Sequence, residues 1–371
     1  MEFKERFKNY KAIEEKRGRL LVVYATSTRA NVPAMIAGDA VREFIDQIDA
    51  IPSDITSIDV LLHSTGGDAL AAWKLMSVLR ERFKSIAVLV PYMAFSAATI
   101  FSLGADEIVM HPHASLGPID PQITMRLPDG TQRRFAFEDV GAFLRFIKEE
   151  VGISEQAYIT SIVDKLFSVV DPINVGASKR ASELATDVGE RLLRMHMTTA
   201  EEKNRARTIA EGLNKTFFAH GDAVSRSRAR ELQLRIADDN SDLEKLLWNA
   251  YIGIESYMCL RNPFNPLQYF LANGGAGSLA HPAPVVLPPN TPPQLANQIW
   301  QQIVQQALQA MSQPTVEVEY TLVNALIEST RKASEYKTIG SLSAARIIGG
   351  EIQLSATDKE AGWREIPLAT S

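Results

Sequence analysis

The sequence predicts an α/β fold, in which short buried strands alternate with amphipathic helices. Three continuous apolar runs indicate strands buried on both faces: Leu20 to Ala25, Ile58 to Leu62 and Ile86 to Val90. The stretch over residues 39–51 carries apolar residues at three- and four-residue spacing, which is typical of an amphipathic helix. This alternation predicts parallel strands joined by right-handed helical crossovers.

The remaining elements of the first part of the chain follow in order. Residues 1–18 form a charged lead-in, and Asp68 can begin a helix directly after the second strand. A short apolar helix is expected over Ala97 to Leu103, and a further strand over Glu107 to Met110. The chain is therefore expected to enter the sheet four times before residue 111.

The pattern changes after this last strand. Residues 111–122 hold three prolines and a glycine, which predicts an irregular and rigid segment. Residues 123–135 predict a hairpin, because Pro128, Asp129 and Gly130 make a typical turn sequence. Amphipathic spacing then predicts helices over residues 137–151, 154–170, 177–197 and 199–213, and another that begins at Ser225.

The last third of the chain differs in composition. The stretch from Asn273 to Pro293 is rich in Gly and Pro and predicts a linker, and residues 294–313 predict a glutamine-rich helix. Residues 316–371 show no chemical motif. We therefore expect a main domain over residues 19–260, a linker over residues 273–293 and a C-terminal extension of unassigned role over residues 294–371.

Composition narrows the possible functions of the 371-residue chain. Its formal net charge of -5 gives no electrostatic reason to expect a nucleic acid as partner. The single cysteine, Cys259, excludes an internal disulfide, and the dispersed histidines leave no Cys/His metal cluster. No apolar stretch reaches the roughly 18 residues that a membrane span needs. We expect a soluble cytoplasmic protein with no metal and no cofactor.

Ser96 lies where the strand before it would turn into the helix after it. A serine at such a turn can expose its hydroxyl, while the unpaired amides of the first helical turn, beginning with Ala97, point at the group it attacks. Gly66 and Gly67 end the preceding strand and can supply a second amide, so the pattern favours an oxyanion hole. The alternatives are a small residue that permits close helix packing and a pair of glycines that only makes a tight turn.

Several of these segments resemble the Clp protease and crotonase superfamily. The sequence HSTGGD over residues 63–68 is followed about thirty residues later by FSAA over residues 95–98. Together with GADEIVMHPHASLGPIDPQ and FFAHGDAVSRSRARELQL, these pieces are most similar to the serine dehydrogenase proteinase family, relatives of signal peptide peptidase A. The resemblance covers roughly residues 15–237 and implies a repeated β-β-α core with additional helices and a C-terminal extension.

The resemblance also implies a catalytic triad in the order Ser, Asp, His. Ser96 is then the nucleophile, the amides of Gly67 and Ala97 form the oxyanion hole, Asp120 is the acid and His220 is the base. In Clp peptidases the histidine occupies the position where this chain has Asp120, and the aspartate occupies the region of His220. If the acid and the base have exchanged these two positions, the chain keeps a serine, a histidine and an aspartate in its active site.

A second mechanism uses a lysine as the base, as in signal peptide peptidase A and its relatives. Lys165 and Lys179 are the candidates in the helices after the proline-rich segment. Lysines on helices are usually solvated, which is the alternative for both. His111 and His113 lie nearer to Ser96 in sequence, but their positions at a strand end favour capping or surface roles.

These features predict a serine peptidase that hydrolyses peptide bonds through an acyl-enzyme on Ser96. The resemblance implies a homo-oligomer that acts on peptides or unfolded proteins. One alternative is a crotonase-type enzyme that acts on acyl thioesters, binds coenzyme A and does not depend on a serine at position 96. The other is a catalytically silent oligomeric scaffold that keeps only the fold.

Overall fold

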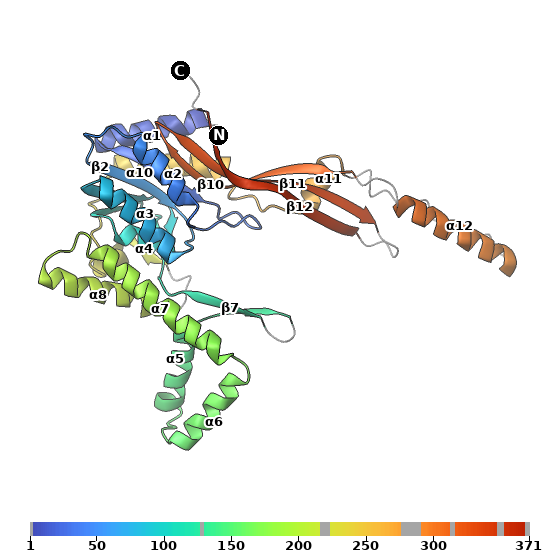
Figure 1. The fold of residues 1–371 in the computed structure, drawn as a ribbon, viewed down its shortest axis with the longest axis horizontal. Helices are drawn as coiled ribbons and strands as arrows, with labels where there is room; N and C mark the ends of the chain where they lie inside the picture. Colours follow the sequence, from blue (N-terminus) through green and yellow to red (C-terminus); the bar gives the residue numbers. More distant parts are fainter. Residues whose placement is uncertain are drawn as a thin grey trace.

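The computed structural model describes residues 3–126, 130–215, 223–275, 291–311, 316–346 and 352–367 (Figure 1). In these ranges the largest sheet has seven strands, in the order β12-β11-β10-β1-β2-β3-β5. Four of them are parallel: β1 (Leu20–Thr26), β2 (Ser57–His63), β3 (Ser85–Val90) and β5 (Glu107–Met110). The predicted α/β fold is confirmed, and these strands match the three apolar runs of the sequence and the further strand predicted after them.

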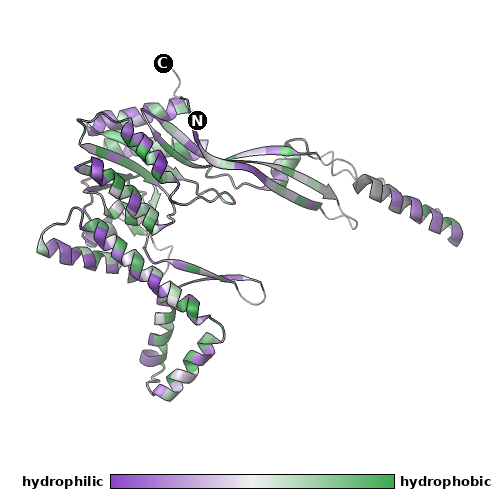
Figure 2. Cartoon of the chain, in the orientation of Figure 1, coloured by the Kyte–Doolittle hydropathy of each residue, from purple (hydrophilic) through white to green (hydrophobic). Residues whose placement is uncertain are grey.

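Helices cover both faces of the parallel strands. On one face lie α2 (Ala40–Asp49), α3 (Ala69–Arg82) and α4 (Ala97–Leu103), which enclose the larger hydrophobic core. On the other face lie α1 (Phe3–Arg17) and α10 (Ser241–Tyr257). Hydrophobic residues are concentrated in the strands and on the inner sides of these helices (Figure 2). Because both faces are covered, the strands are apolar along their whole length rather than alternating.

A helical arm leaves this domain after residue 121 and returns to it (Figure 1). The two strands of the predicted hairpin are paired, although Pro128 and Asp129 of its turn lie outside the described residues, and the four predicted helices are present, with a π-helical turn in the first. In order, the elements are β7 (Gln122–Arg126), β8 (Gln132–Ala136), α5 (Phe137–Arg145), the π-helix Phe146–Glu150, α6 (Gln156–Phe167), α7 (Pro172–Leu193) and α8 (Ala200–Lys215). The far end of α7 packs on α4 and α8, which anchors the arm to the larger core.

The C-terminal part of the chain contributes three long antiparallel strands that the sequence did not predict. β10 (Val318–Ser329) pairs with β1, and β11 (Ala333–Arg346) and β12 (Ile352–Glu365) follow as a meander. These strands run out beyond the domain as a ribbon, near which lie α11 (Pro266–Ala272) and, farther out, α12 (Pro293–Met311) (Figure 1). Part of the predicted C-terminal extension is therefore a component of the central sheet.

A buried ion pair fixes β10 to the first helix. Arg6 of α1 and Glu328 of β10 are both fully buried and form a salt bridge, in which the Arg6 Nε donates to Glu328 over 3.0 Å. The Tyr10 hydroxyl also donates to the Glu328 carboxylate, over 2.7 Å. A buried charge is tolerated only when it is compensated in this way, so α1 and β10 depend on each other.

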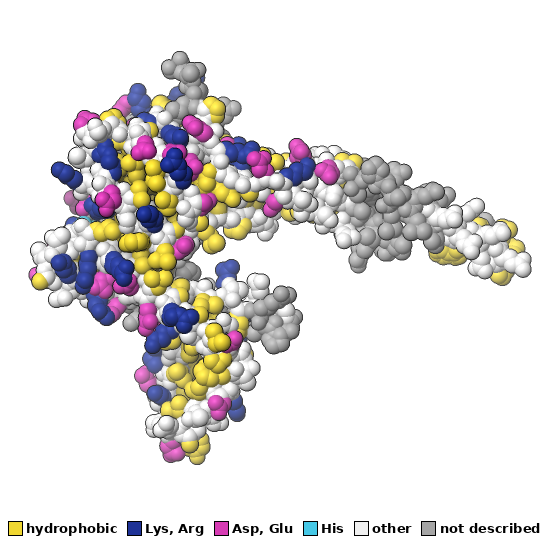
Figure 3. Space-filling view, in the orientation of Figure 1, with side chains coloured by type: hydrophobic (Ala, Val, Ile, Leu, Met, Phe, Trp, Pro, Cys, Tyr) yellow, Lys and Arg dark blue, Asp and Glu magenta, His cyan; other side chains and the backbone are white. Residues whose placement is uncertain are grey.

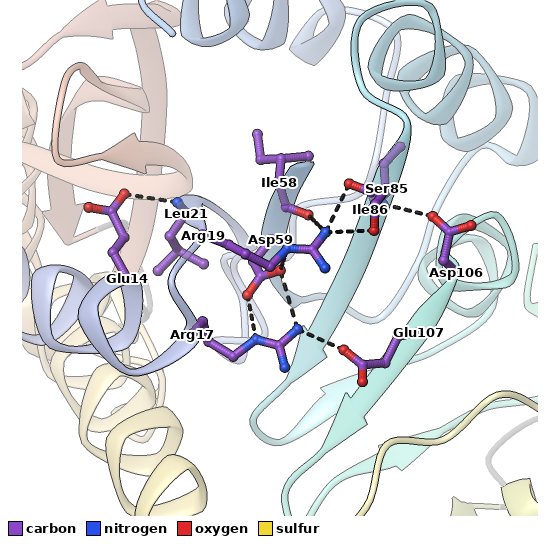
Figure 4. A network of polar contacts seen from close by, with 10 residues as sticks. All are labelled: Glu14, Arg17, Arg19, Leu21, Ile58, Asp59, Ser85, Ile86, Asp106 and Glu107. Atoms are coloured by element: carbon purple, nitrogen blue, oxygen red, sulfur yellow. Dashed lines mark hydrogen bonds and ion pairs between the residues drawn. The ribbon is translucent and has the colours of Figure 1, made fainter. Parts of the chain in front are cut away.

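A polar network closes the amino-terminal edge of the parallel strands (Figure 4). The buried carboxylate of Asp59 pairs with Arg17 over 2.7 Å and with Arg19 over 2.8 Å. Arg17 also pairs with Glu107 on β5, and Arg19 donates to the backbone carbonyl of Ser85. The charges at this edge satisfy one another, so the network ties the end of α1 to the amino-terminal ends of β2, β3 and β5.

Candidate active site

Ser96 lies at the carboxyl edge of the sheet, between the short strand β4 (Met93–Ala94) and α4. Its backbone has φ +52° and ψ -117°, a conformation that residues other than glycine rarely adopt. Ser96 is the N-cap of α4, yet its side chain makes no capping hydrogen bond. The half-buried hydroxyl is therefore held at a strained turn without the usual role of an N-cap serine.

The glycine loop after β2 lies directly against this turn. Gly66 has φ +108°, and a β-carbon there would lie 2.7 Å from the Ser96 Cβ and 2.6 Å from the Phe95 carbonyl oxygen. The amide of Phe95 donates to the Ser64 carbonyl over 3.0 Å, and the Ser64 amide donates to the Met93 carbonyl over 3.1 Å. Main-chain hydrogen bonds thus hold the glycine loop and the serine turn together.

The two glycine amides have different surroundings. The Gly66 amide donates to the Ser64 hydroxyl over 3.0 Å, and that hydroxyl accepts from Thr26 over 2.7 Å. Gly67 forms a parallel bridge with Ile36, in which Ile36 bonds to the residues on either side of Gly67. The amide of the central residue in such a bridge points away from the partner. Among the described residues, the loop hydrogen bonds include neither this amide nor that of Ala97.

Thr99, one turn into α4, links the serine turn to the proline-rich segment. Its hydroxyl oxygen lies 2.7 Å from the Ala94 carbonyl oxygen and 2.9 Å from that of Gly117, and the Gly117 amide donates to it over 3.0 Å. A β-carbon on Gly117 would lie 3.0 Å from the Phe95 ring. The proline-rich segment over residues 111–122 therefore packs, through Gly117, against the residues on either side of Ser96.

Asp120 follows in this segment and is half-buried. The amide of its neighbour Ile119 donates to the Leu213 carbonyl over 3.0 Å at the end of α8. Just before it, β6 (Ser115–Leu116) pairs with β9 (Val224–Ser225). Residues 213 and 224 thus both contact the segment that carries Asp120. His220 lies outside the described residues, between these two points of the chain.

Residues 30–132 match the family of ClpP-like SDH-type serine proteinases. This span contains the glycine loop, the serine turn and the proline-rich segment. This match confirms the resemblance to the serine dehydrogenase proteinase family that the sequence motifs indicated. The match includes Asp120 and ends before His220, Lys165 and Lys179.

Two uncharacterized proteins of Methanocaldococcus jannaschii are similar to part of the chain, at 38% and 40% identity over 82 residues. Each match spans 22% of this chain and 28% of the relative. Among solved structures, the 1510-N membrane-bound stomatin-specific protease is 17% identical with a TM-score of 0.35, over 57% of this chain and 79% of that chain. ClpP1 from Listeria monocytogenes is 13% identical with a TM-score of 0.33, over 63% and 97%.

The two candidate lysines lie on the arm rather than beside the ClpP-like loops. Lys165 of α6 and Lys179 of α7 are both exposed. The Lys179 side chain is 58% exposed and lies 3.8 Å from Glu183, one turn along the same helix. A lysine base requires apolar surroundings that disfavour its charge, and the described residues do not provide them for either exposed side chain.

Three further histidines are packed among aromatic rings on the α10 side of the sheet. His63 is fully buried, neither of its ring nitrogens hydrogen-bonds to a described residue, and burial lowers its pKa to about 3. Burial likewise lowers the pKa of His111, whose ring stacks on Trp248 with centroids 5.1 Å apart. The His113 amide donates to the His111 ring. The sequence favoured capping or surface roles for both residues: the His111 ring caps the His113 amide but is buried, whereas His113 is exposed, as a surface role predicts.

Sequence reasoning missed two groups that shape the site. Ile36 holds the glycine loop through two main-chain hydrogen bonds, which no side-chain pattern can indicate. Thr99 could have been found, because a polar residue three positions after Ser96 in a buried helix lies one turn along and needs a partner. Within the described ranges, no group of three or more His, Cys, Asp or Glu side chains could hold a metal ion.

Proposed function

We propose that the protein is a serine peptidase that hydrolyses peptide bonds through an acyl-enzyme on Ser96. The observation that carries this proposal is the Ser96 turn, where a strained serine that caps nothing lies against Gly66. Such a turn presents a hydroxyl to a bound substrate while the first amides of the helix remain free to donate. The match to the ClpP-like serine proteinases supports the same class of reaction.

The reaction would proceed in two halves. The Ser96 oxygen attacks the peptide carbonyl carbon, its proton passes to a base, and the carbonyl oxygen becomes an oxyanion. The amides of Gly67 and Ala97 would donate to that oxyanion; the Gly66 amide already donates to Ser64, so Gly66 shapes the loop instead. The tetrahedral intermediate expels the amine, which takes the proton, and water then hydrolyses the ester on Ser96.

In this proposal His220 is the base and Asp120 orients its ring. Support comes from the pairing of the Asp120 segment with Leu213 and with β9, the described residues on either side of the span that holds His220. Lys165 and Lys179 remain the alternative bases, and the exposure of both within this chain is why we rank them second.

We further propose that the protein assembles into a homo-oligomer through its helical arm. Hydrophobic side chains gather on the surface of the arm (Figure 3). They include Phe146, Val151, Tyr158 and Ile173, which are 48 to 76% exposed. Contiguous exposed apolar surface of this kind is typical of protein interfaces. Substrates would be peptides or unfolded proteins, and the cytoplasm remains the proposed location.

A fluorophosphonate probe tests the proposed chemistry, because it reacts only with activated serine hydroxyls. We expect the wild-type protein and a Ser168→Ala control to be labelled and the Ser96→Ala variant to remain unlabelled, with all three equally folded by circular dichroism. Labelling that persists in Ser96→Ala would contradict the assignment. A folded oligomer without labelling would support the scaffold, and binding of coenzyme A would support the crotonase-type enzyme.

A further inference from the structure

A recess opens at the carboxyl edge of the sheet, on the face that α10 covers. Its volume is about 390 Å³, and its walls include Tyr92, Trp248, Tyr251, Ile252, Glu255 and Arg261. Tyr92 follows β3, whereas the other five residues belong to α10 or to the turn after it. The part of the chain that matches the ClpP-like family ends at residue 132, so the α10 wall lies outside that match. We call this hollow the aromatic recess.

Three rings pack together in the wall of the recess; Tyr251 is buried, and Tyr92 and Trp248 form the part that a ligand can reach. The Tyr251 centroid lies 5.1 Å from that of Tyr92 and 5.2 Å from that of Trp248, and Tyr92 meets Trp248 edge to face at 6.1 Å. Tyr92 is 37% exposed, as is Ile252 beside it. A surface of this kind offers both apolar area and ring faces to an incoming side chain.

Two histidines support these rings from behind. His63 stacks on Tyr92 with centroids 6.2 Å apart and packs against Tyr251 at 5.0 Å. His111 stacks on Trp248 at 5.1 Å. The rings are therefore held in place before any ligand binds, which lowers the entropy cost of binding.

The rim of the recess carries one acidic and one basic side chain. The Glu255 carboxylate accepts a hydrogen bond from Tyr251, and Arg261 is exposed. Their formal charges cancel, so the recess does not select a cation or an anion. An acceptor and a donor beside an apolar surface instead suit the N–H and C=O groups of a peptide whose side chain lies on the rings.

The recess lies close to the proposed nucleophile. Three residues separate Tyr92 from Ser96 along the chain through β4, so their α-carbons are at most about 14 Å apart. An extended peptide advances roughly 3.3 Å per residue. A substrate whose reactive bond lies at Ser96 would thus reach the recess within about three to five residues.

We propose that the aromatic recess is a substrate subsite that takes an aromatic side chain of the peptide, three to five residues from the bond that is cleaved. This inference rests on the proposed peptidase function, because it places the substrate relative to Ser96. Trp248, Tyr92 and Ile252 are then specificity-determining residues. The side chain buries its apolar area on the rings, and Glu255 and Arg261 hold the adjoining main chain.

A set of fluorogenic peptides of equal length tests this assignment. Each peptide carries a single Phe in an otherwise Ala and Ser background, placed two to six residues from the cleaved bond on either side. We expect one placement between three and five residues to lower KM about tenfold, as burial of an aromatic ring against others would do, with kcat little changed. Equal KM values for all placements would overturn the subsite.

Two matched variants locate the effect. Ile252→Glu puts a charge on the recess wall, whereas Leu271→Glu puts the same charge on α11, at a side chain of similar exposure, 40% against 37%. We expect Ile252→Glu to abolish the Phe preference, so that the KM of the favoured Phe peptide rises to that of the peptide without Phe. Leu271→Glu should behave as the wild type. A Phe preference that survives Ile252→Glu would contradict the proposal.

A binding measurement separates this inference from the proposed function. In the Ser96→Ala variant we expect the favoured Phe peptide to change the fluorescence of Trp248, with the signal lost in a further Trp248→Phe substitution. If Ser96 is labelled but Phe placement has no effect, the subsite is wrong and the peptidase stands. If Ser96 is never labelled but the peptide still binds at Trp248, the recess is a peptide site and the peptidase assignment is wrong.

Discussion

Gly66 and Ser96 are in direct contact, and the space between them is too small for a side chain. A β-carbon at position 66 would lie 2.7 Å from the Ser96 Cβ and 3.0 Å from the Ala97 amide nitrogen. Both atoms belong to the turn that would place the nucleophile and one oxyanion donor. The glycine at this position therefore determines how closely the two loops approach.

Replacing Gly66 with Ala should disturb the site more than the fold. The new methyl group would push the loop away from Ser96, so we expect fluorophosphonate labelling to fall at least tenfold, with a stability loss of about 1 to 3 kcal/mol. Gly152→Ala is the matched control, because Gly152 also has positive φ but has no atom within 4 Å of the added carbon. Normal labelling of Gly66→Ala would show that the close contact has no catalytic role.

Substituting the candidate bases one at a time should identify the group that activates Ser96. We expect His220→Ala to slow acylation by about 10² to 10⁴, the usual contribution of a general base. Lys165→Ala and Lys179→Ala should stay within about twofold of the wild type, because both lysines are exposed within this chain. Pre-steady-state labelling rates measure this directly. A large loss in either lysine variant, with the oligomer intact, would assign the base to the arm.

His63 should make the fold less stable in weak acid. Burial lowers its pKa from 6.5 to about 3, so below pH 6.5 the unfolded chain takes up a proton that the folded chain refuses. Stability from this group is complete above pH 6.5 and falls as the pH decreases toward 3, by roughly 2 kcal/mol at pH 5. Urea unfolding of His63→Phe should show a smaller loss between pH 7 and 5 than the wild type.

The exposed ring of His113 provides the comparison for that experiment. His113→Phe should keep the acid sensitivity of the wild type, since it leaves His63 in place. An identical pH dependence in the wild type and in His63→Phe would mean that the buried ring is protonated in the folded protein.

The pair formed by Arg6 and Glu328 should show strong coupling. Glu328→Gln leaves the buried guanidinium without a compensating charge, and we expect a loss of about 3 to 5 kcal/mol in the free energy of unfolding. The double variant Arg6→Met with Glu328→Leu removes both charges and should recover most of that loss. If the double variant is no more stable than Glu328→Gln, packing rather than charge would hold β10 against α1.

Much of the fold could be predicted because the parallel strands are buried on both faces. Their apolar runs are visible in the sequence, and so is the N-cap at Asp68, which accepts from the Leu70 amide over 2.8 Å. β10 was missed because its burial changes along its length, from alternating near Val318 to fully buried near Ser329. β12 was missed because it is exposed or half-buried throughout. Neither strand carries one periodic signal.

The candidate site was predictable to a similar extent. The position of Ser96 between a strand and a helix follows from local patterns, and so do the strained turn and the neighbouring glycines. The main-chain hydrogen bonds of Ile36 to the residues on either side of Gly67 join two distant parts of the sequence. Any residue type can form such bonds, so the sequence does not indicate them. The aromatic recess joins Tyr92 to α10 across more than 150 residues, so it too could be recognised only in three dimensions.

The pairing of β10 with β1 has a consequence for the order in which the protein can be made. β1 leaves the ribosome before the other parallel strands, but its neighbour on one side is complete only after Ser329. The partner of Arg6 is synthesised equally late. Until then the nascent chain exposes an unpaired strand edge, so we expect chaperones to hold it and the sheet to close only after β10 has been synthesised.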